Sequence, residues 1–287
     1  FTTDLKISRN RSKKIKFQSY KRIVYLWLYL LLMLEKQIIA EAEYRYIELG
    51  EGTPVVILHG LMGGLSNFEG VINYFPIRGY KILVPELPVY DLPIVDSSVK
   101  SLADFLNNFL NFKNLEEVVL MGNSLGGHVA LLYTKFYPEK VKGLIITGSS
   151  GLYENAMGDG YPKRGDYEYI KAKSEEVFYD PKIATKEIVD EVFESVNDRN
   201  KLLRTLAIAK SAIRHNMAKD LPNMHTRTAI IWGAQDSVTP PNVADEFNSL
   251  LPNSDLYWID KCGHAPMMEH PDRFNEIMHS WMEKYNI

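Results

Sequence analysis

A serine set among glycines is the residue that most directly suggests chemistry. The sequence GNSLGG, Gly122–Gly127, lies between an apolar run and a helical pattern. The spacing Gly-x-Ser-x-Gly is typical of a sharp strand-to-helix turn, in which larger side chains would clash and the serine backbone is strained. The amide of Leu125 then falls at a helix N-terminus, where negative charge is favoured. This combination predicts acyl chemistry with Ser124 as the nucleophile. The competing interpretation is that the small residues only allow a close strand–helix contact.

A serine nucleophile needs a general base, and the base needs an acid that orients it. Asp236 and His264 each follow a separate strand-like run downstream of Ser124. The order serine, aspartate, histidine is the one expected for a sheet of this kind. Although an aspartate in a turn commonly caps that turn, we predict that Asp236 is the acid and His264 the base. Asp255 and Asp260 stay open as alternatives for the acid.

The sequence HGLMGG, His59–Gly64, follows another apolar run and is expected to supply a main-chain donor. A turn at Gly60 directs the amide of Leu61 toward the serine, where it pairs with the amide of Leu125 as an oxyanion hole. The six histidines other than the predicted base form no metal-ligand spacing, and Cys262 is interpreted as a loop thiol. The sequence predicts neither a metal site nor a cofactor.

Short apolar runs alternate with helical patterns along the body of the chain. This alternation predicts an α/β fold with a mostly parallel central sheet and helices on both faces. Tyr44–Leu49 alternates like an edge strand, whereas the later runs are continuous, as in strands that are covered on both faces. These later runs are Val55–Gly60, Tyr80–Pro85, Val118–Gly122, Gly143–Gly148, Thr228–Gly233 and Ser254–Ile259. Helices are expected at Ser101–Asn111, Leu125–Tyr137, Pro241–Leu250 and Pro271–Tyr285.

One interval, from about Gly151 to Pro222, contains helical patterns and no strand-like run. Three amphipathic helices are expected there, at Asp166–Phe178, Thr185–Val196 and Lys201–Asn216. A long helical insertion between two strands predicts a lid over one end of the sheet. The expected organisation is an N-terminal arm at 1–34, an α/β core at 35–150 and 223–287, and a helical lid at 151–222.

Composition restricts the class of protein. The 287-residue chain is 46% apolar and 24% charged, which is typical of globular proteins. Its formal charge is −3, but residues 1–32 carry eight Lys and Arg against one Asp, a net +7, which leaves −10 for the remainder. An acidic body argues against nucleic-acid binding. A single cysteine argues against a disulfide framework and against a zinc site built from thiolates.

The apolar run Ile23–Leu34 follows the basic residues. It is too short to span a bilayer but matches the apolar region of a signal peptide. Three interpretations stay open: a translated upstream or artefactual extension ahead of a start at Met33, an export or anchor signal with a cleavage site near Ala40–Ala42, and a membrane-surface arm. A cytoplasmic location is expected under the first of these. A membrane partner is expected only if the arm is genuine.

The motifs HGLMGG, GNSLGG, WGAQDSVTP and CGHAPMMEHP together resemble those of the α/β-hydrolase superfamily, from about Tyr44 to Tyr285. The resemblance implies an α/β-hydrolase fold and the catalytic and oxyanion roles given above. The chain looks most like the meta-cleavage-product hydrolases, which cut C–C bonds in aromatic ring-fission products, and like small carboxylesterases. Serine at position 124 argues against the dehalogenase and epoxide hydrolase branches, which use Asp there.

Two features depart from the C–C hydrolase pattern. Those enzymes usually have Trp directly after the catalytic histidine, where this chain has Ala265. Their lid also offers an arginine to the substrate carboxylate, for which Arg199 and Arg204 are both candidates. Met62, beside the expected oxyanion donor, is a further candidate substrate contact.

The expected function is hydrolysis of a small ester or related acyl substrate through an acyl-enzyme. Three alternatives stay open: C–C bond hydrolysis of ring-fission products, acyl transfer to an alcohol or peroxide, and a small-molecule receptor of the same fold with slow or no turnover. The expected partner is a small-molecule acyl substrate, with no nucleic acid. The sequence gives no prediction of oligomeric state.

Overall fold

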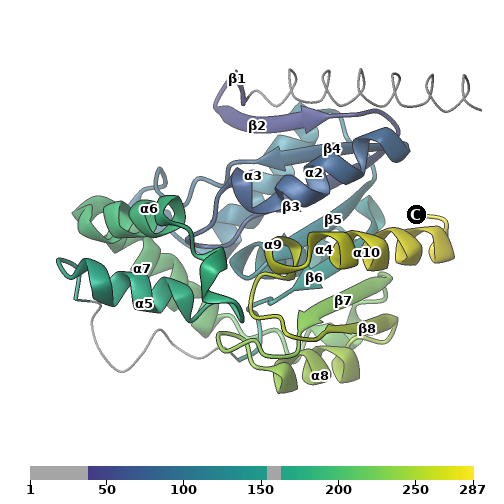
Figure 1. Cartoon of the computed structure of the whole chain (residues 1–287). Helices are drawn as coiled ribbons and strands as arrows, with labels where there is room; N and C mark the ends of the chain where they lie inside the picture. Colours follow the sequence, from purple (N-terminus) through teal and green to yellow (C-terminus); the bar gives the residue numbers. More distant parts are fainter. Residues whose placement is uncertain (1–37, 154–162) are drawn as a thin grey trace, which may run out of the picture. The chain divides into compact units, whose positions relative to one another are not determined.

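The computed structural model describes residues 38–153 and 163–287 (Figure 1). The chain divides into two units, Phe1–Ile38 and Ile39–Ile287, and the elements below all belong to the second unit. The predictions for residues 1–34, and for 154–162 of the lid, lie outside the described residues. Within the described ranges, no helix is both long and apolar enough to cross a membrane.

The strands seen in the described residues form one sheet in the order β1-β2-β4-β3-β5-β6-β7-β8. They are β1 (Ile39–Glu41), β2 (Tyr44–Leu49), β3 (Thr53–Leu58), β4 (Tyr80–Pro85), β5 (Val118–Asn123), β6 (Val141–Thr147), β7 (Thr228–Gly233) and β8 (Ser254–Ile259). Strand β2 is antiparallel to β1 and β4, and the other neighbours are parallel. The predicted fold class, a mostly parallel sheet, is therefore confirmed.

The two ends of the sheet correct the sequence interpretation. Tyr44–Leu49 was expected at the edge, but β1 pairs outside it and four of its six residues are buried. Ser254–Ile259 was expected to be covered on both faces, but it is the edge strand β8, and only Ile259 is fully buried. Trp258 on this strand is 39% exposed. The alternating pattern of β2 and the apolar run of β8 therefore each indicated the wrong position in the sheet.

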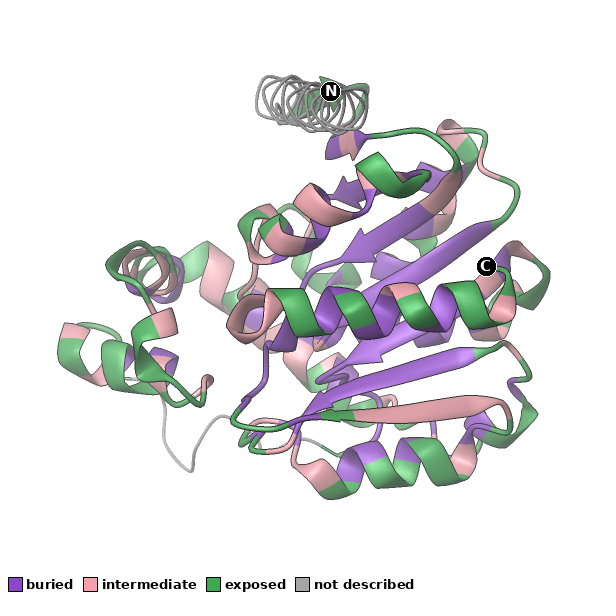
Figure 2. Cartoon of the chain, turned by 45° about the vertical axis from the view of Figure 1, so that its right-hand side comes forward, coloured by how far each residue is buried: buried purple, intermediate pink, exposed green. Residues whose placement is uncertain are grey.

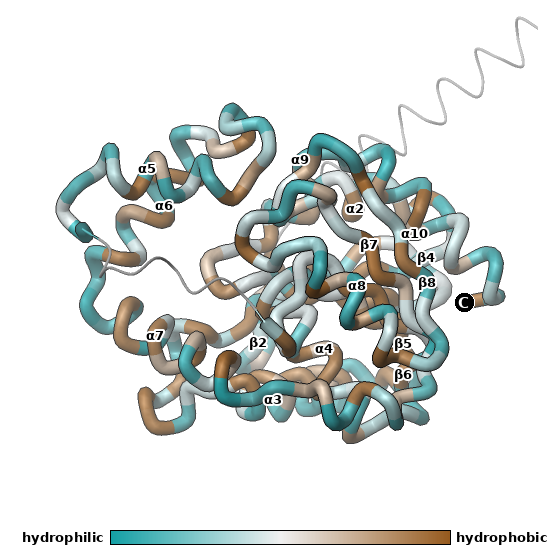
Figure 3. Tube along the Cα trace, turned by 90° about the horizontal axis from the view of Figure 1, so that it is seen from below, coloured by the Kyte–Doolittle hydropathy of each residue, from teal (hydrophilic) through white to brown (hydrophobic). Residues whose placement is uncertain are grey.

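Helices cover both faces of the sheet (Figures 2 and 3). The longer ones outside the lid are α2 (Glu69–Tyr74), α3 (Val99–Phe112), α4 (Leu125–Phe136), α8 (Pro241–Leu250) and α10 (Pro271–Tyr285), and α9 (Pro266–Glu269) is a single turn. Short 3-10 turns occur at η1 (Leu65–Phe68), η2 (Pro76–Arg78), η3 (Ile94–Asp96), η4 (Pro138–Lys140), η5 (Pro181–Ile183) and η6 (Leu221–Asn223).

The core follows from strand alternation, because successive side chains point to opposite faces of a sheet. Leu58, Leu120 and Ile146 belong to a buried cluster that also contains apolar residues of α3, α4 and α8. Their neighbours Ile57 and Ile145 are equally buried, although they lie outside that cluster. Burial on both faces explains why these central strands have continuous apolar sequences.

The predicted helical insertion consists of α5 (Tyr167–Glu175), α6 (Lys186–Asn197) and α7 (Arg199–Arg214). It lies between β6 and β7, which pair directly with each other, so the insertion leaves the sheet unbroken. Carboxylates of Asp166 and Asp198 accept main-chain hydrogen bonds at the starts of α5 and α7, which satisfies amides that lack an intrahelical partner. Figure 1 shows these helices beside one end of the strands. We refer to them as the lid.

Candidate active site

Ser124 occupies a strained backbone position between β5 and α4. Its φ and ψ angles are 56° and −121°. A non-glycine residue at such angles costs on the order of 1–3 kcal/mol, and such residues persist where the surrounding structure enforces them. The sharp strand-to-helix turn expected from the glycine spacing is therefore present.

The glycines on either side of Ser124 have no room for a side chain. A Cβ on Gly122 would lie 2.3 Å from the carbonyl oxygen of Gly126, and a Cβ on Gly126 would lie 2.1 Å from the carbonyl oxygen of Leu58. Both contacts are with main-chain atoms, which cannot move aside. The close packing and the strained serine are thus two consequences of the same turn.

Asp236 and His264 form a direct, buried pair. Asp236 lies in the loop after β7 and His264 in the loop after β8, and Nδ1 of the histidine is 2.9 Å from Oδ2 of the aspartate. The Asp236 side chain is 0% exposed and the His264 side chain is 8% exposed. With the Nδ1 proton donated to the carboxylate, Nε2 is left as the acceptor for a substrate or serine proton.

The Asp236 carboxylate is held by three further donors. The amides of Val238 and Thr239 donate to Oδ1 at 2.8 and 2.9 Å, and the Thr239 hydroxyl donates to Oδ2 at 2.8 Å. The same hydroxyl is 3.3 Å from Nδ1 of His264. Asp236 therefore caps its own turn and also orients the histidine. Sequence analysis missed Thr239, although its position three residues after the aspartate is a recognisable signal for such a turn.

The two alternative acids have other partners. Asp255 accepts hydrogen bonds from Trp281 and Tyr285 and pairs with Lys284 of α10. Asp260 accepts from the side-chain amide of Gln235 at 3.1 Å. Neither is bonded to His264, so the choice of Asp236 agrees with the geometry.

Asn123 joins the serine end of the site to the histidine loop. Its side-chain amide donates to the carbonyl oxygens of Thr147 and His264, both at 3.1 Å. The amide of Ser124 donates to the same Thr147 carbonyl, also at 3.1 Å. A Cβ on Gly148 would lie 2.8 Å from Nδ1 of His264, so the imidazole lies against the end of β6. The three predicted residues are thus gathered at the carboxyl ends of β5, β7 and β8. Asn123 was another residue that sequence analysis missed.

The predicted oxyanion loop, His59–Gly64, begins beside the serine. A Cβ on Gly60 would lie 3.2 Å from Cβ of Ser124. Leu61 follows directly, and Leu125 is the first residue of α4, where amides lack an intrahelical acceptor. Leu61 and Leu125 therefore lie on two segments that meet at Ser124, and their role as oxyanion donors stays a prediction.

His59 braces the oxyanion loop, a role that sequence analysis did not assign. Its Nε2 accepts a hydrogen bond from the amide of Leu87 at 2.8 Å, so Nδ1 carries the proton and donates to the carbonyl of Gly60 at 2.9 Å. Burial lowers the pKa of His59, which keeps the ring neutral. The histidine of the HGLMGG motif is therefore a structural support.

The candidate substrate contacts are Arg199 and Arg204 on α7 and Met62 in the HGLMGG sequence. The Arg204 guanidinium donates to the carbonyls of Leu92 and Asn200, at 2.7 and 3.1 Å, and so fastens α7 to the loop after β4. Arg199 is exposed at the start of α7, and Met62 is partly buried in the oxyanion loop. Across the described residues, no group of three or more His, Cys, Asp or Glu side chains could hold a metal ion.

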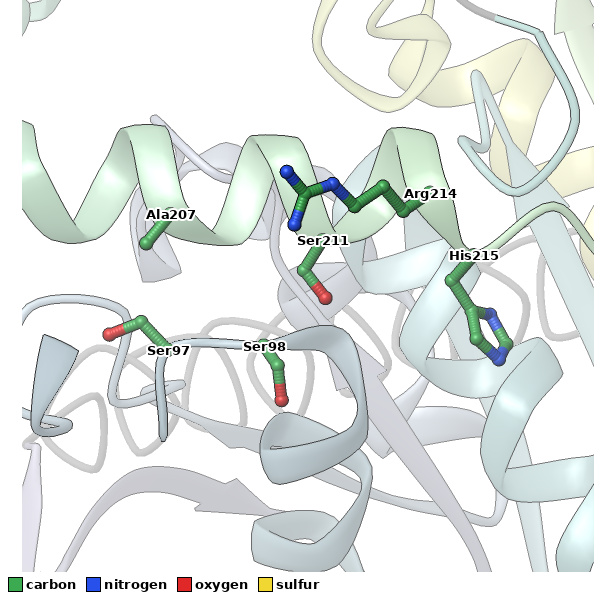
Figure 4. Close-up of a pocket in the computed structure, with 6 residues that line it drawn as sticks. All are labelled: Ser97, Ser98, Ala207, Ser211, Arg214 and His215. Carbon is green, nitrogen blue, oxygen red and sulfur yellow. The ribbon is translucent and has the colours of Figure 1, made fainter. Parts of the chain in front are cut away.

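A separate pocket of about 380 Å³ lies between α7 of the lid and the loop that precedes α3 (Figure 4). It is lined by Ser97, Ser98, Ala207, Ser211, Arg214 and His215. The Val99 amide donates to the Ser211 hydroxyl at 3.2 Å, and Nδ1 of His215 is 3.1 Å from Nε2 of His128 on α4. Burial, with a smaller contribution from His215, lowers the pKa of His128 to about 3. None of the lining residues belongs to the predicted triad.

A known family and a known crystal structure match most of this chain. The family model described as "alpha/beta hydrolase fold" matches residues 53–175 and 168–271. The chain belongs to the α/β-hydrolase fold family. An α/β-hydrolase enzyme from a sediment metagenome of the Mar Chica lagoon, Morocco, known from its crystal structure, is 55% identical; the match covers 88% of this chain and 100% of that one, with a TM-score of 0.74.

Curated relatives of this α/β hydrolase include named C–C bond hydrolases. A 2-hydroxy-6-oxononadienedioate/2-hydroxy-6-oxononatrienedioate hydrolase of Pseudomonas sp is 26% identical, over 83% of this chain and 90% of its own length. A 2-hydroxy-6-oxo-6-phenylhexa-2,4-dienoate hydrolase of Burkholderia cepacia is 24% identical, over 80% and 87%. The chain is thus a hydrolase enzyme, and the predicted superfamily and branch are confirmed.

Proposed function

We propose that this enzyme is a serine hydrolase that cleaves small, uncharged esters through an acyl-enzyme. Two observations support the proposal: Ser124 lies at a strained turn, and the neighbouring Asn123 side chain is hydrogen-bonded to the carbonyl of His264, whose ring forms a buried pair with Asp236. In the cycle, Nε2 of His264 takes the Ser124 proton as the hydroxyl oxygen bonds to the substrate carbonyl carbon. The oxyanion accepts hydrogen bonds from the amides of Leu61 and Leu125.

The second half of the cycle uses the same groups. The histidine returns its proton to the departing alcohol as the C–O bond breaks, which leaves an acyl ester on Ser124. Water then loses a proton to His264 and attacks the acyl carbon, and the released serine regains a proton. The net reaction converts an ester and water into a carboxylic acid and an alcohol.

C–C bond hydrolysis of a ring-fission dienoate is the second candidate, because the curated relatives carry such names. Those substrates are carboxylates, and two features favour an uncharged substrate instead. The Arg204 guanidinium is already engaged by two carbonyls. In addition, a Cβ on Gly64 of the oxyanion loop would lie 3.7 Å from Oε1 of Glu191 on α6. A carboxylate at this loop opposes a second negative charge.

The charge environment of Tyr90 is consistent with this location of Glu191. Burial raises the pKa of the Tyr90 phenol; a hydrogen bond with Ser195 opposes the rise and the negative charge of Glu191 adds to it. Glu191 of the lid therefore lies close enough to Tyr90 to affect its phenol, and Nζ of Lys201 lies 5.2 Å from the centre of the same ring.

A pair of matched substrates tests the proposed substrate class. We expect kcat/KM for p-nitrophenyl valerate to exceed that for mono-p-nitrophenyl glutarate by about tenfold, which corresponds to ~1.4 kcal/mol. Glu191→Gln should raise the value for the anionic ester by about threefold and leave the neutral ester unchanged, because an exposed charge contributes modestly. Glu194→Gln, on the same helix, is the control.

The same assay separates the competing functions. Equal kcat/KM for both esters would contradict the uncharged-substrate proposal while leaving the acyl-enzyme intact. A higher kcat/KM for a ring-fission dienoate than for every ester would favour C–C hydrolysis. A single burst of p-nitrophenol without continued turnover would instead favour a receptor.

A further inference from the structure

The lid is hydrogen-bonded to both loops that carry the acid–base pair. The amide of His264 donates to the carbonyl of Val177 at 2.9 Å. The hydroxyl of Ser237, next to Asp236, donates to the carbonyl of Glu176 at 2.8 Å. Glu176 and Val177 follow α5, so a short segment of the lid insertion is hydrogen-bonded to both loops.

One carboxylate joins the same lid segment to the histidine loop. Glu269, the last residue of α9, accepts a hydrogen bond from the amide of Gly263 through Oε1 at 2.7 Å. Its Oε2 accepts one from the amide of Tyr179 at 2.8 Å. Gly263 immediately precedes His264. The two oxygens of a single side chain therefore connect the catalytic histidine loop with the lid.

The fit at this junction is close. A Cβ on Gly263 would lie 2.6 Å from the carbonyl oxygen of Val177 and 2.9 Å from the amide nitrogen of Tyr179. The neighbouring Cys262 thiol lies 3.8 Å from Oε1 of Glu269. Burial, followed by the charge of Glu269, raises the pKa of that thiol. The thiol therefore stays neutral, and Glu269 provides the local negative charge for the two amides.

We propose that Glu269 is a positioning residue that fixes the His264 imidazole by clamping its loop to the lid. The inference rests on the proposed serine-hydrolase function. Hydrogen bonds to a charged acceptor are roughly twice as strong as neutral ones, so the two Glu269 bonds are expected to be stronger than the bonds to the Val177 and Glu176 carbonyls. A displacement of about 1 Å at a reacting group costs on the order of 10²-fold in rate. Lid position and histidine alignment are thus coupled through one side chain.

Kinetics of two Glu269 variants test the clamp. Glu269→Gln keeps the shape and one acceptor oxygen, but its amide nitrogen cannot accept the second bond. Glu269→Ala removes both bonds. We expect kcat for p-nitrophenyl butyrate, per site titrated with a phosphonate, to fall about tenfold in the first variant and about 10²-fold in the second, with KM changed less than threefold. Glu246→Gln, on the distant α8, is the matched control.

The outcomes separate positioning from stability and from the proposed function. If Glu269 were only structural, both variants would lose melting temperature but keep kcat per titrated site within twofold, and the proposal would be overturned. If neither variant folds, Tyr179→Pro, which removes the amide that donates to Oε2 of Glu269 and keeps Glu269 itself, should lower kcat per site severalfold; an unchanged kcat would overturn the clamp. Failure of Ser124→Ala to abolish turnover would sink the proposed function itself.

Discussion

Replacing Ser124 with alanine is expected to reduce kcat/KM for p-nitrophenyl butyrate by about 10⁴-fold or more, because no other described group takes the place of the attacking oxygen. The strained φ of 56° is equally unfavourable for serine and alanine, so the melting temperature should change little. Steady-state kinetics and thermal unfolding of the same preparation measure both quantities.

Ser249→Ala provides the matched control for the Ser124 variant. Ser249 lies on α8, where its hydroxyl donates to the carbonyl of Glu246, and its loss should leave kcat/KM within twofold of the original enzyme. Residual activity of Ser124→Ala within about 10²-fold of the original would mean that another residue attacks the substrate.

Replacing Asp236 with asparagine is expected to lower kcat by about 10³- to 10⁴-fold. Asparagine preserves the shape and can still accept from the amides of Val238 and Thr239. Its amide nitrogen, however, faces Nδ1 of His264 in place of an acceptor oxygen. The ring must then present Nδ1 as an acceptor and carry its proton on Nε2, where it cannot take the Ser124 proton.

The rival acid supplies the control for this second variant. Asp260→Asn removes a surface charge but keeps an oxygen that can accept the hydrogen bond from Gln235, and kcat should remain within about threefold. A larger loss in Asp260→Asn than in Asp236→Asn would show that the acid has been assigned to the wrong residue. Both values come from stopped assays with the same ester.

Most of the sheet could be predicted because its central strands are buried on both faces. Residues 228–233 and 80–85 match β7 and β4 without error, since a continuous apolar run has few other places in a folded chain. β1 was missed because its three exposed residues, Ile39–Glu41, have no periodic pattern. The edge strand β8 resembled a buried strand because Leu256, Tyr257 and Trp258 form an apolar run. In the structure these side chains are only partly covered.

In the candidate site, residues marked by a local sequence pattern could be predicted, and residues defined by long-range contacts could not. Ser124 could be found because its motif is local: the glycines that make the turn lie within a few residues of it. Asp236 and His264 could be found because the ends of parallel strands meet at one edge of the sheet. The supporting residues depend on contacts distant in sequence. Glu269 reaches Tyr179 across 90 positions and Asn123 reaches His264 across 141, and no local pattern marks those pairings.

The lid arginines show how a family expectation can meet a different local structure. Arg204 lies on the lid as expected, but its guanidinium is bound to the carbonyls of Leu92 and Asn200. The bond to Leu92 fastens the lid to the core, whereas the bond to Asn200 lies within α7. An arginine of the lid can thus attach the lid to the core instead of binding a substrate carboxylate. The substrate class has to be inferred from other charges, such as that of Glu191.

Covalent labelling tests most directly whether Ser124 is the nucleophile activated by His264. The enzyme would be treated with a p-nitrophenyl alkylphosphonate, and the adduct located by peptide mass spectrometry as activity is lost. We expect one adduct per chain, on Ser124, formed in step with inactivation, and labelling slowed at least about 10²-fold in His264→Ala. Full inactivation with the adduct on another residue, or undiminished labelling without the imidazole, would contradict the assignment.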